Sequence, residues 1–325
     1  RTQKIEIVEK TMNSIKIAVT ASRLEGGTFY YYIGTSEDQL QEQGSSQETE
    51  FTFENLNPGK TYYIKVKGVS KEGKETEKHI TAQIDSIPDA EGNITYTIKW
   101  NNGTATVTFR STSGYTIETS KDGITYTKSS VVSDVQNGGI VRARLTNGNY
   151  HGTEITVTVM DSEKPKLTVK TGTVTSKSIE LIATATDSES GITGQAYSYY
   201  IGKGGETSTP SGNNTTGNYT FDNLDQNTTY EIKVEIEDKA GNKATETIET
   251  KTQLIPSASS AINREVVWNA NGTAQVTLST TTNYTILYST DRSKWDTYTN
   301  PLSVNNGQTI YICLTDGRNR GEEYG

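Results

Sequence analysis

The chain has 325 residues with a formal net charge of −8, and only 31% of them are hydrophobic. The acidic balance has no basic stripe of the kind that nucleic acid requires, and no apolar run approaches the ~20 residues of a membrane span. A single cysteine excludes an intrachain disulfide, and two histidines leave little for zinc binding or histidine-based catalysis.

The chain repeats itself. LNPGKTYYIKV at 56–66 returns as LDQNTTYEIKV at 224–234, and ARLTNG at 143–148 returns as ICLTDG at 312–317. These matches predict an A-B-A-B array of four modules. We name them A1 (1–85), B1 (86–162), A2 (163–253) and B2 (254–325). The start at Arg1 rather than Met leads us to expect a piece of a longer protein.

Within each module the apolar residues fall on alternate positions, as in a strand with one buried face. In A1 this holds for Ile15, Ile17 and Val19, and in B2 for Ile310, Ile312 and Leu314. Asn-Gly steps separate such runs, as tight hairpins require. The predicted fold class is all-β: four tandem immunoglobulin-like or fibronectin type III-like β-sandwiches in an elongated array.

The motif LNPGKTYYIKV predicts a tyrosine corner, in which the leucine closes the core and the tyrosine hydroxyl reaches back to the preceding turn. The corner residues are Leu56 and Tyr62 in A1, and Leu224 and Tyr230 in A2. The pattern L-x-P-G-x-T-Y-x-I-x-V resembles fibronectin type III modules, although Gln226 and Asn227 replace the Pro-Gly pair in A2.

The B modules resemble bacterial immunoglobulin-like domains of Gram-positive surface proteins. The resemblance rests on YTIETSKDGITY (115–126), YTILYSTDRSKW (284–295) and IYICLTDGRNRGE (310–322), together with EDKAGN (237–242) in A2. It implies a multi-module protein on the bacterial cell surface, outside the cell.

Three acidic residues of A2 are candidate calcium ligands: Asp187 and Glu189 in TDSESG, and Asp238 in EDKAGN. Carboxylate oxygens suit a hard cation, and both motifs belong at one end of A2. The alternative is turn chemistry, because Asp and Ser commonly begin turns. Apart from this candidate, no cofactor is expected.

Outward tyrosines form a candidate contact surface at Tyr30, Tyr32 and Tyr200. They either stack on glycans or pack against filament neighbours, or they reflect strand propensity alone. Lys65 and Lys233 are also expected on the outer face, which disfavours a buried isopeptide crosslink.

The end of B2 differs from the end of B1. B1 closes with alternating Ile155, Val157 and Val159, whereas B2 stops at GEEYG (321–325) without an equivalent strand. Either the chain is trimmed, or a neighbouring chain donates the strand. Cys313 aligns with Arg144 and is expected to face outward.

The sequence has no nucleophile elbow, phosphate loop or paired-cysteine motif, so we do not expect an enzyme. The first hypothesis is a non-catalytic stalk, spacer or filament subunit that contacts its own copies or flanking modules. The alternative is an adhesin or phage appendage that binds glycan or a host protein through exposed tyrosines and loop tips.

Overall fold

The computed structural model describes residues 3–206 and 208–325. In this part of the chain the strands form eight antiparallel sheets, and the only helix is the single turn α1 (Ala258–Ala261). The predicted all-β fold of tandem sandwiches is confirmed, while the exact module boundaries remain a prediction. The helix in the described residues is far too short and polar to cross a membrane.

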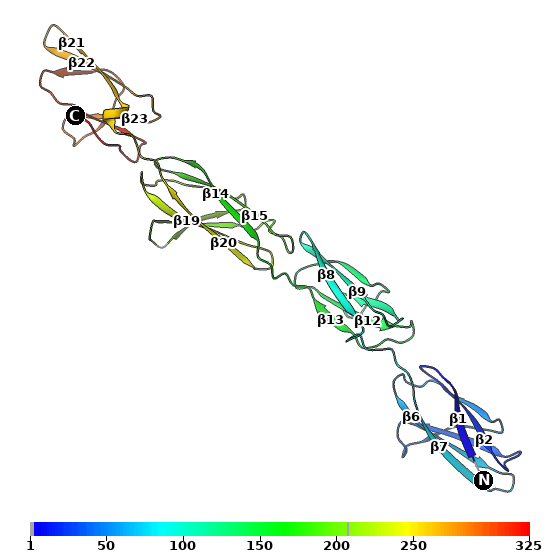
Figure 1. Ribbon diagram of the computed structural model, residues 1–325. Coiled ribbons are helices and arrows are strands. Elements are labelled where there is room, and N and C mark those ends of the chain that lie inside the picture. The colour runs from blue at the N-terminus through cyan, green and yellow to red at the C-terminus, as the bar shows by residue number, and fades with distance from the viewer. Residues whose placement is uncertain (1–2, 207) are drawn as a thin grey trace. The chain divides into compact units, whose positions relative to one another are not determined.

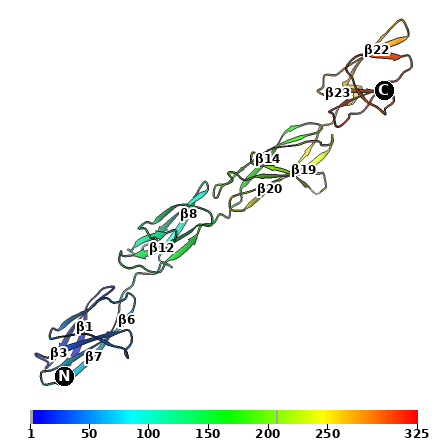
Figure 2. The ribbon, with the colours of Figure 1, turned by 180° about the vertical axis from the view of Figure 1, so that it is seen from behind.

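A1 is a sandwich of a three-stranded and a four-stranded sheet with strand orders β1-β2-β5 and β4-β3-β6-β7. Its strands are β1 (Gln3–Lys10), β2 (Ile15–Ala21), β3 (Thr28–Gly34), β4 (Gln41–Ser46), β5 (Glu50–Phe53), β6 (Thr61–Val69) and β7 (Glu75–Gln83). Figure 1 shows these strands in blue, and Figure 2 shows them from behind. The alternating residues Ile15, Ile17 and Val19 are buried, and Tyr31 stacks on Phe51 at 4.3 Å between ring centroids.

A2 repeats this topology, with strand orders β14-β15-β18 and β17-β16-β19-β20. Its strands are β14 (Lys166–Val174), β15 (Ile179–Thr186), β16 (Tyr197–Lys203), β17 (Thr209–Asn214), β18 (Asn218–Phe221), β19 (Thr229–Glu237) and β20 (Lys243–Lys251). Tyr199 stacks on Tyr219 at 4.4 Å, which reproduces the aromatic pair of A1. The repeat in the sequence is thus also a repeat in the packing of the core.

B1 has two sheets with strand orders β11-β9-β8 and β10-β12-β13. Its strands are β8 (Thr95–Asn101), β9 (Thr104–Arg110), β10 (Thr116–Ser120), β11 (Val131–Val135), β12 (Ile140–Thr146) and β13 (Ile155–Thr158). The last strand, β13, pairs with β12 and brings Val157 into the core, where Val159 is also buried. By its contacts the hairpin tip Trp100–Ala105 belongs with residues 160–325.

B2 contains α1 and two sheets with strand orders β21-β22-β25 and β24-β23-β26. Its strands are β21 (Asn263–Trp268), β22 (Thr273–Ser279), β23 (Thr285–Ser289), β24 (Asp296–Thr297), β25 (Leu302–Asn305) and β26 (Tyr311–Thr315). The outward placement expected for Cys313 is wrong, because its side chain is 1% exposed. The C-terminal segment folds back along the edge of β26 through the bridges Thr315↔Arg320 and Ile312↔Tyr324, and β26 is buried on both faces.

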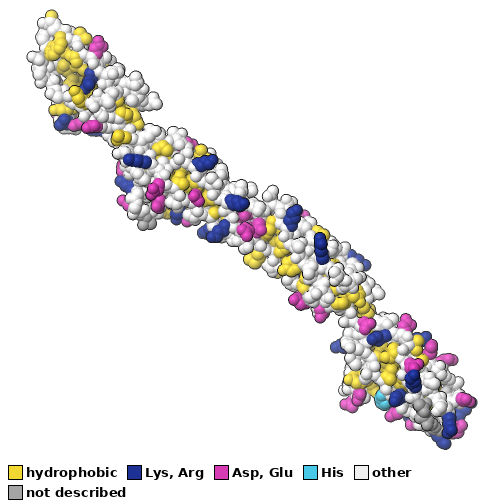
Figure 3. Space-filling view, viewed as in Figure 1, with side chains coloured by type: hydrophobic (Ala, Val, Ile, Leu, Met, Phe, Trp, Pro, Cys, Tyr) yellow, Lys and Arg dark blue, Asp and Glu magenta, His cyan; other side chains and the backbone are white. Residues whose placement is uncertain are grey.

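In B1 the strand β13 continues along the edge of β12, whereas the equivalent edge of β26 in B2 is unpaired beyond Tyr324 among the described residues. The bridge Ile312↔Tyr324 occupies the place of the pair Ala143↔Ile155, and no pair follows it among the described residues of B2. Apolar side chains consequently line an open groove there, among them Val276, Leu278 and Ile310. Figure 3 shows apolar side chains gathered on the surface of B2, where Val266, Val267 and Trp268 are each more than half exposed.

Candidate functional site

Both modules of the A type contain the hydrogen bond that defines a tyrosine corner. The four predicted residues are all buried: Leu56, Tyr62, Leu224 and Tyr230. The Tyr62 hydroxyl accepts a bond of 2.8 Å from the backbone N–H of Asn57, and the Tyr230 hydroxyl accepts one of 2.9 Å from that of Asp225. Because each bond ties the turn before β6 or β19 to the strand itself, these residues are structural.

The candidate contact tyrosines lie on the outer faces of β3 and β16. All three are half-buried: Tyr30, Tyr32 and Tyr200. The Lys65 ammonium lies 4.3 Å from the centre of the Tyr32 ring, and that of Lys233 lies 4.0 Å from the centre of the Tyr200 ring. A hydrogen bond to Glu235 raises the pKa of Tyr200. Two of the three rings are therefore already in contact with lysines of the same sheet.

The structure brings two of the three predicted acidic residues of A2 together with a third that sequence reasoning missed. Oxygens of Asp161, Asp187 and Asp238 all lie within 4.8 Å of one another. Asp161 precedes β14, Asp187 follows β15, and Asp238 follows β19, so the three meet at one end of A2. The signal that could have identified Asp161 is its place in the joint between B1 and A2 (160–166). Glu189 lies beside the cluster, because its backbone N–H donates to Asp187 Oδ1 at 3.1 Å.

Backbone N–H groups hold each aspartate of the cluster in position. Asp161 accepts bonds from Glu163 N at 2.9 Å and Ser190 N at 3.0 Å. Asp187 accepts from the N–H groups of Glu189 and Gly191, and Asp238 accepts from those of Ala240 and Asn242. The cluster is therefore ordered by turns on three separate segments of the chain.

The pKa values of Asp161 and Glu189 are shifted in opposite directions. Burial acts to raise the pKa of Asp161, but hydrogen bonds from Ser190 and Glu163 outweigh it and the pKa is lowered. Burial, a side-chain hydrogen bond to Asp161 and the neighbouring negative charges raise the pKa of Glu189 to about 7. Near neutral pH a proton on Glu189 thus relieves part of the repulsion between the carboxylates.

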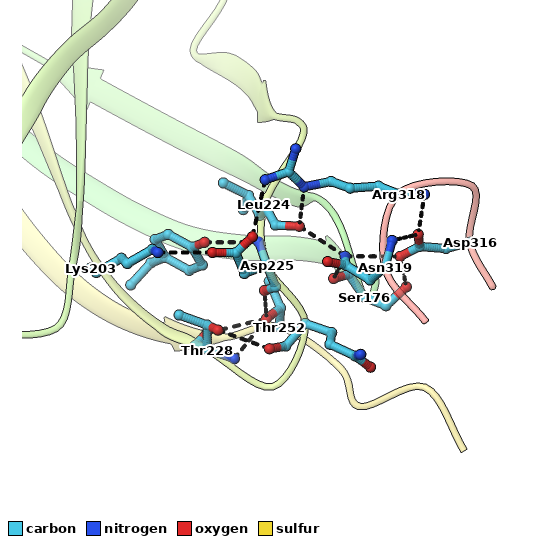
Figure 4. A network of polar contacts seen from close by, with 11 residues as sticks. Ser176, Lys203, Leu224, Asp225, Thr228, Thr252, Asp316, Arg318 and Asn319 are labelled. Carbon is cyan, nitrogen blue, oxygen red and sulfur yellow. Dashed lines mark hydrogen bonds and ion pairs between the residues drawn. The ribbon is translucent and has the colours of Figure 1, made fainter. Parts of the chain in front are cut away.

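A second polar site joins A2 to B2 (Figure 4). The loop Asp316–Arg320 of B2 lies against the turns of A2 at Ser176 and Leu224. Asn319 Nδ2 lies 3.0 Å from the carbonyl oxygen of Leu224 and 3.2 Å from that of Ser176. Ser176 Oγ donates to Asp316 Oδ2 at 2.5 Å. Burial acts to raise the pKa of Asp316, but hydrogen bonds to its carboxylate from the Ser176 hydroxyl and from Asn319 and Arg318 outweigh it and lower the pKa.

Charged groups extend this joint at its exposed side. Arg318 Nε donates to the Leu224 carbonyl oxygen at 3.0 Å, and its guanidinium pairs with Asp225 at 3.0 Å. Lys203 pairs with the same carboxylate at 2.8 Å, and both partners lower the pKa of Asp225. Gln226 Nε2 donates to the Arg320 carbonyl oxygen. The joint therefore combines a buried polar centre with an exposed ionic rim.

The comparison with protein families supports the fold of A1. Residues 3–84 match the model of the fibronectin type III domain. Among solved structures, the chain is similar to a crystal structure of domains A168-A170 from titin, with 15% identity, 77% of this chain and 97% of that chain covered, and a TM-score of 0.28. It is also similar to the central fibronectin-III array of RIM-binding protein, with 10% identity, 99% and 95% coverage, and a TM-score of 0.22. No curated protein matches the sequence.

The chain is a tandem array of fibronectin type III-like and immunoglobulin-like sandwiches, an architecture of structural and interaction modules.

Proposed function

We propose that this chain is a non-catalytic structural segment, a stalk, spacer or filament subunit, of a protein on the outer surface of bacteria. Its polar composition, acidic charge and repeated sandwiches suit a chain that holds other parts of a protein away from the cell. Its partners are flanking modules of the same protein or neighbouring copies of the chain.

The observation that carries this proposal is the joint between A2 and B2. A flexible linker would leave the two modules independent, but here Asn319 and Arg318 of B2 bond directly to backbone and side-chain oxygens of A2. Ser176, at the centre of the joint, is 1% exposed. Polar groups buried between modules are costly unless they stay paired, so the joint favours one fixed arrangement of the two modules. Such a joint suits a segment that transmits force.

The adhesin alternative depends on the faces of the outward tyrosines. A glycan stacks on a free aromatic face, but lysines already lie over Tyr32 and Tyr200. Binding would have to displace Lys65 or Lys233, which makes the structural role the better supported of the two.

Antibodies against the chain test the proposed location. They should label intact cells that produce the protein, without permeabilisation. Labelling that appears only after lysis would contradict a surface role. A glycan array probed with the soluble chain tests the alternative, and binding that is lost in Tyr200→Ala would favour the adhesin.

A further inference from the structure

The charge of Asp238 at the end of A2 is not required by the turn that carries it. In A1 the same hairpin is closed by Ser70, whose N–H donates to the Lys74 carbonyl oxygen as that of Asp238 donates to Asn242. Ser70 Oγ accepts from Lys74 N just as Asp238 Oδ1 accepts from Asn242 N. A serine therefore suffices for this turn, and the charge of Asp238 needs another explanation.

The loop after the second strand also differs in charge between the two A modules. Asp187 lies two residues after Ala185 on β15, and Arg23 lies two residues after Ala21 at the equivalent place on β2. The two A modules thus share the fold but not the charge at this end. Two of the three clustered carboxylates occur only in A2, although A1 folds without them.

A buried hydroxyl beside the cluster is an independent sign that the cluster binds a ligand. Ser190 is 2% exposed, and its Oγ has no hydrogen-bond partner among the described residues. Its backbone N–H donates to Asp161 Oδ2 at 3.0 Å, which places the hydroxyl beside the cluster. A buried hydroxyl without a partner is costly, so this oxygen is expected to bind something in the same space as the carboxylates.

The size and chemistry of the cluster fit a calcium ion. Calcium binds six to eight oxygens at 2.3–2.6 Å, so oxygens on opposite sides of the ion are about 5 Å apart. One carboxylate oxygen from each of the three aspartates lies within 4.8 Å of the other two. We propose that Asp161, Asp187 and Asp238 bind one calcium ion, with Ser190 Oγ and the Glu189 carboxylate beside it and water completing the shell. This proposal is independent of the proposed surface role.

The charges around the cluster are compatible with a bound cation. In the part of the chain that the structure describes, no ion pair joins Asp187, Glu189 or Asp238 to a lysine or arginine. Lys164 and Lys166 line an open pocket next to the cluster, together with Asp187 and Glu189. Calcium would link Asp161 of the joint to the two loops of A2 that carry Asp187 and Asp238.

Isothermal titration of the full chain with CaCl2 tests the proposal. We expect one ion per chain with a Kd of about 0.1–1 mM, as in extracellular calcium modules. Asp238→Ser, which keeps the turn in the form seen at Ser70, should weaken binding by about tenfold or more, and so should the isosteric Asp187→Asn. Calcium should raise the Tm of the wild type but not of Asp238→Ser.

A matched control is Ser70→Ala, which changes the equivalent turn of A1 and should leave the Kd unchanged. The proposal fails if the wild type takes up no calcium at about 10 mM CaCl2, or if Asp238→Ser binds as tightly as the wild type. Equal affinity for MgCl2 would overturn the assignment to calcium, because magnesium demands a smaller and more regular shell.

Discussion

Replacing Asn319 by alanine tests whether the joint between A2 and B2 is a structural element. The substitution removes the amide that lies within bonding distance of the carbonyl oxygens of Ser176 and Leu224. Because Ser176 is 1% exposed, its carbonyl oxygen would be left buried without this donor. Such a loss costs about 1–3 kcal/mol. The Arg318 bond to Leu224 remains, so we expect about 2 kcal/mol in the stability of B2.

Thermal unfolding followed by tryptophan fluorescence measures this effect. Trp268 and Trp295 both lie in B2, so a Trp100→Phe background restricts the signal to that module. For a module of this size, about 2 kcal/mol corresponds to a fall in Tm of about 8–16 °C. Asn149→Ala, in the equivalent loop of B1, should leave the B2 transition unchanged.

Arg318→Ala tests whether the exposed ionic rim of the joint stabilises B2 less than its buried polar centre does. Its guanidinium pairs with Asp225 where both side chains are 42% exposed, and exposed ion pairs contribute little. We therefore expect a smaller fall in Tm than for Asn319→Ala. If B2 of Asn319→Ala melts at the wild-type temperature, the joint does not stabilise B2 and the reasoning is refuted.

Three further predictions concern single modules. Because the folded pKa of Glu189 is about 7 against an ordinary value of 4.5, the stabilising proton is fully present below about pH 4.5 and lost as pH rises through about 7. In the presence of a calcium chelator, the Tm of the wild type should therefore fall relative to that of Glu189→Gln as the pH rises from about 5 to 7.5. Parallel curves of Tm against pH for the two proteins would contradict this. Tyr230→Phe removes the acceptor of a backbone N–H and should lower the stability of A2 by about 1–2 kcal/mol in urea unfolding, whereas an unchanged midpoint would argue against the corner. Because Tyr324 takes the place of Ile155, Gly325 takes that of Thr156, so extending the chain after Gly325 with the residues that follow Thr156 in B1 should bury two valines and stabilise B2 by about 1.5–3 kcal/mol for each. An unchanged Tm on extension would show that the groove is not an unfilled strand position.

The sequence was sufficient for the sandwich fold because its signals are local. Alternation at Ile15, Ile17 and Val19 needs only a strand with one buried face, and the spacing from Leu56 to Tyr62 needs only one turn. Each signal also occurs twice, which separates it from chance.

The sequence was insufficient where distant segments meet. Asp161 is far from Asp187 and Asp238 along the chain, and no spacing rule connects a module joint to two loops. Cys313 was misplaced because alternation assumes one wet face, whereas both faces of β26 are buried and the side chains of Arg320 and Glu323 lie near the thiol. The joint at Asn319 likewise depends on turns of A2 that only folding brings near.

Force spectroscopy of the single chain, pulled from its two ends, tests the central claim that four separate sandwiches act as load-bearing units. The account predicts four unfolding events, each of which releases about 250 Å of extended chain, as expected for a module of about 80 residues. Fewer events with longer releases, or gradual extension without distinct events, would contradict it.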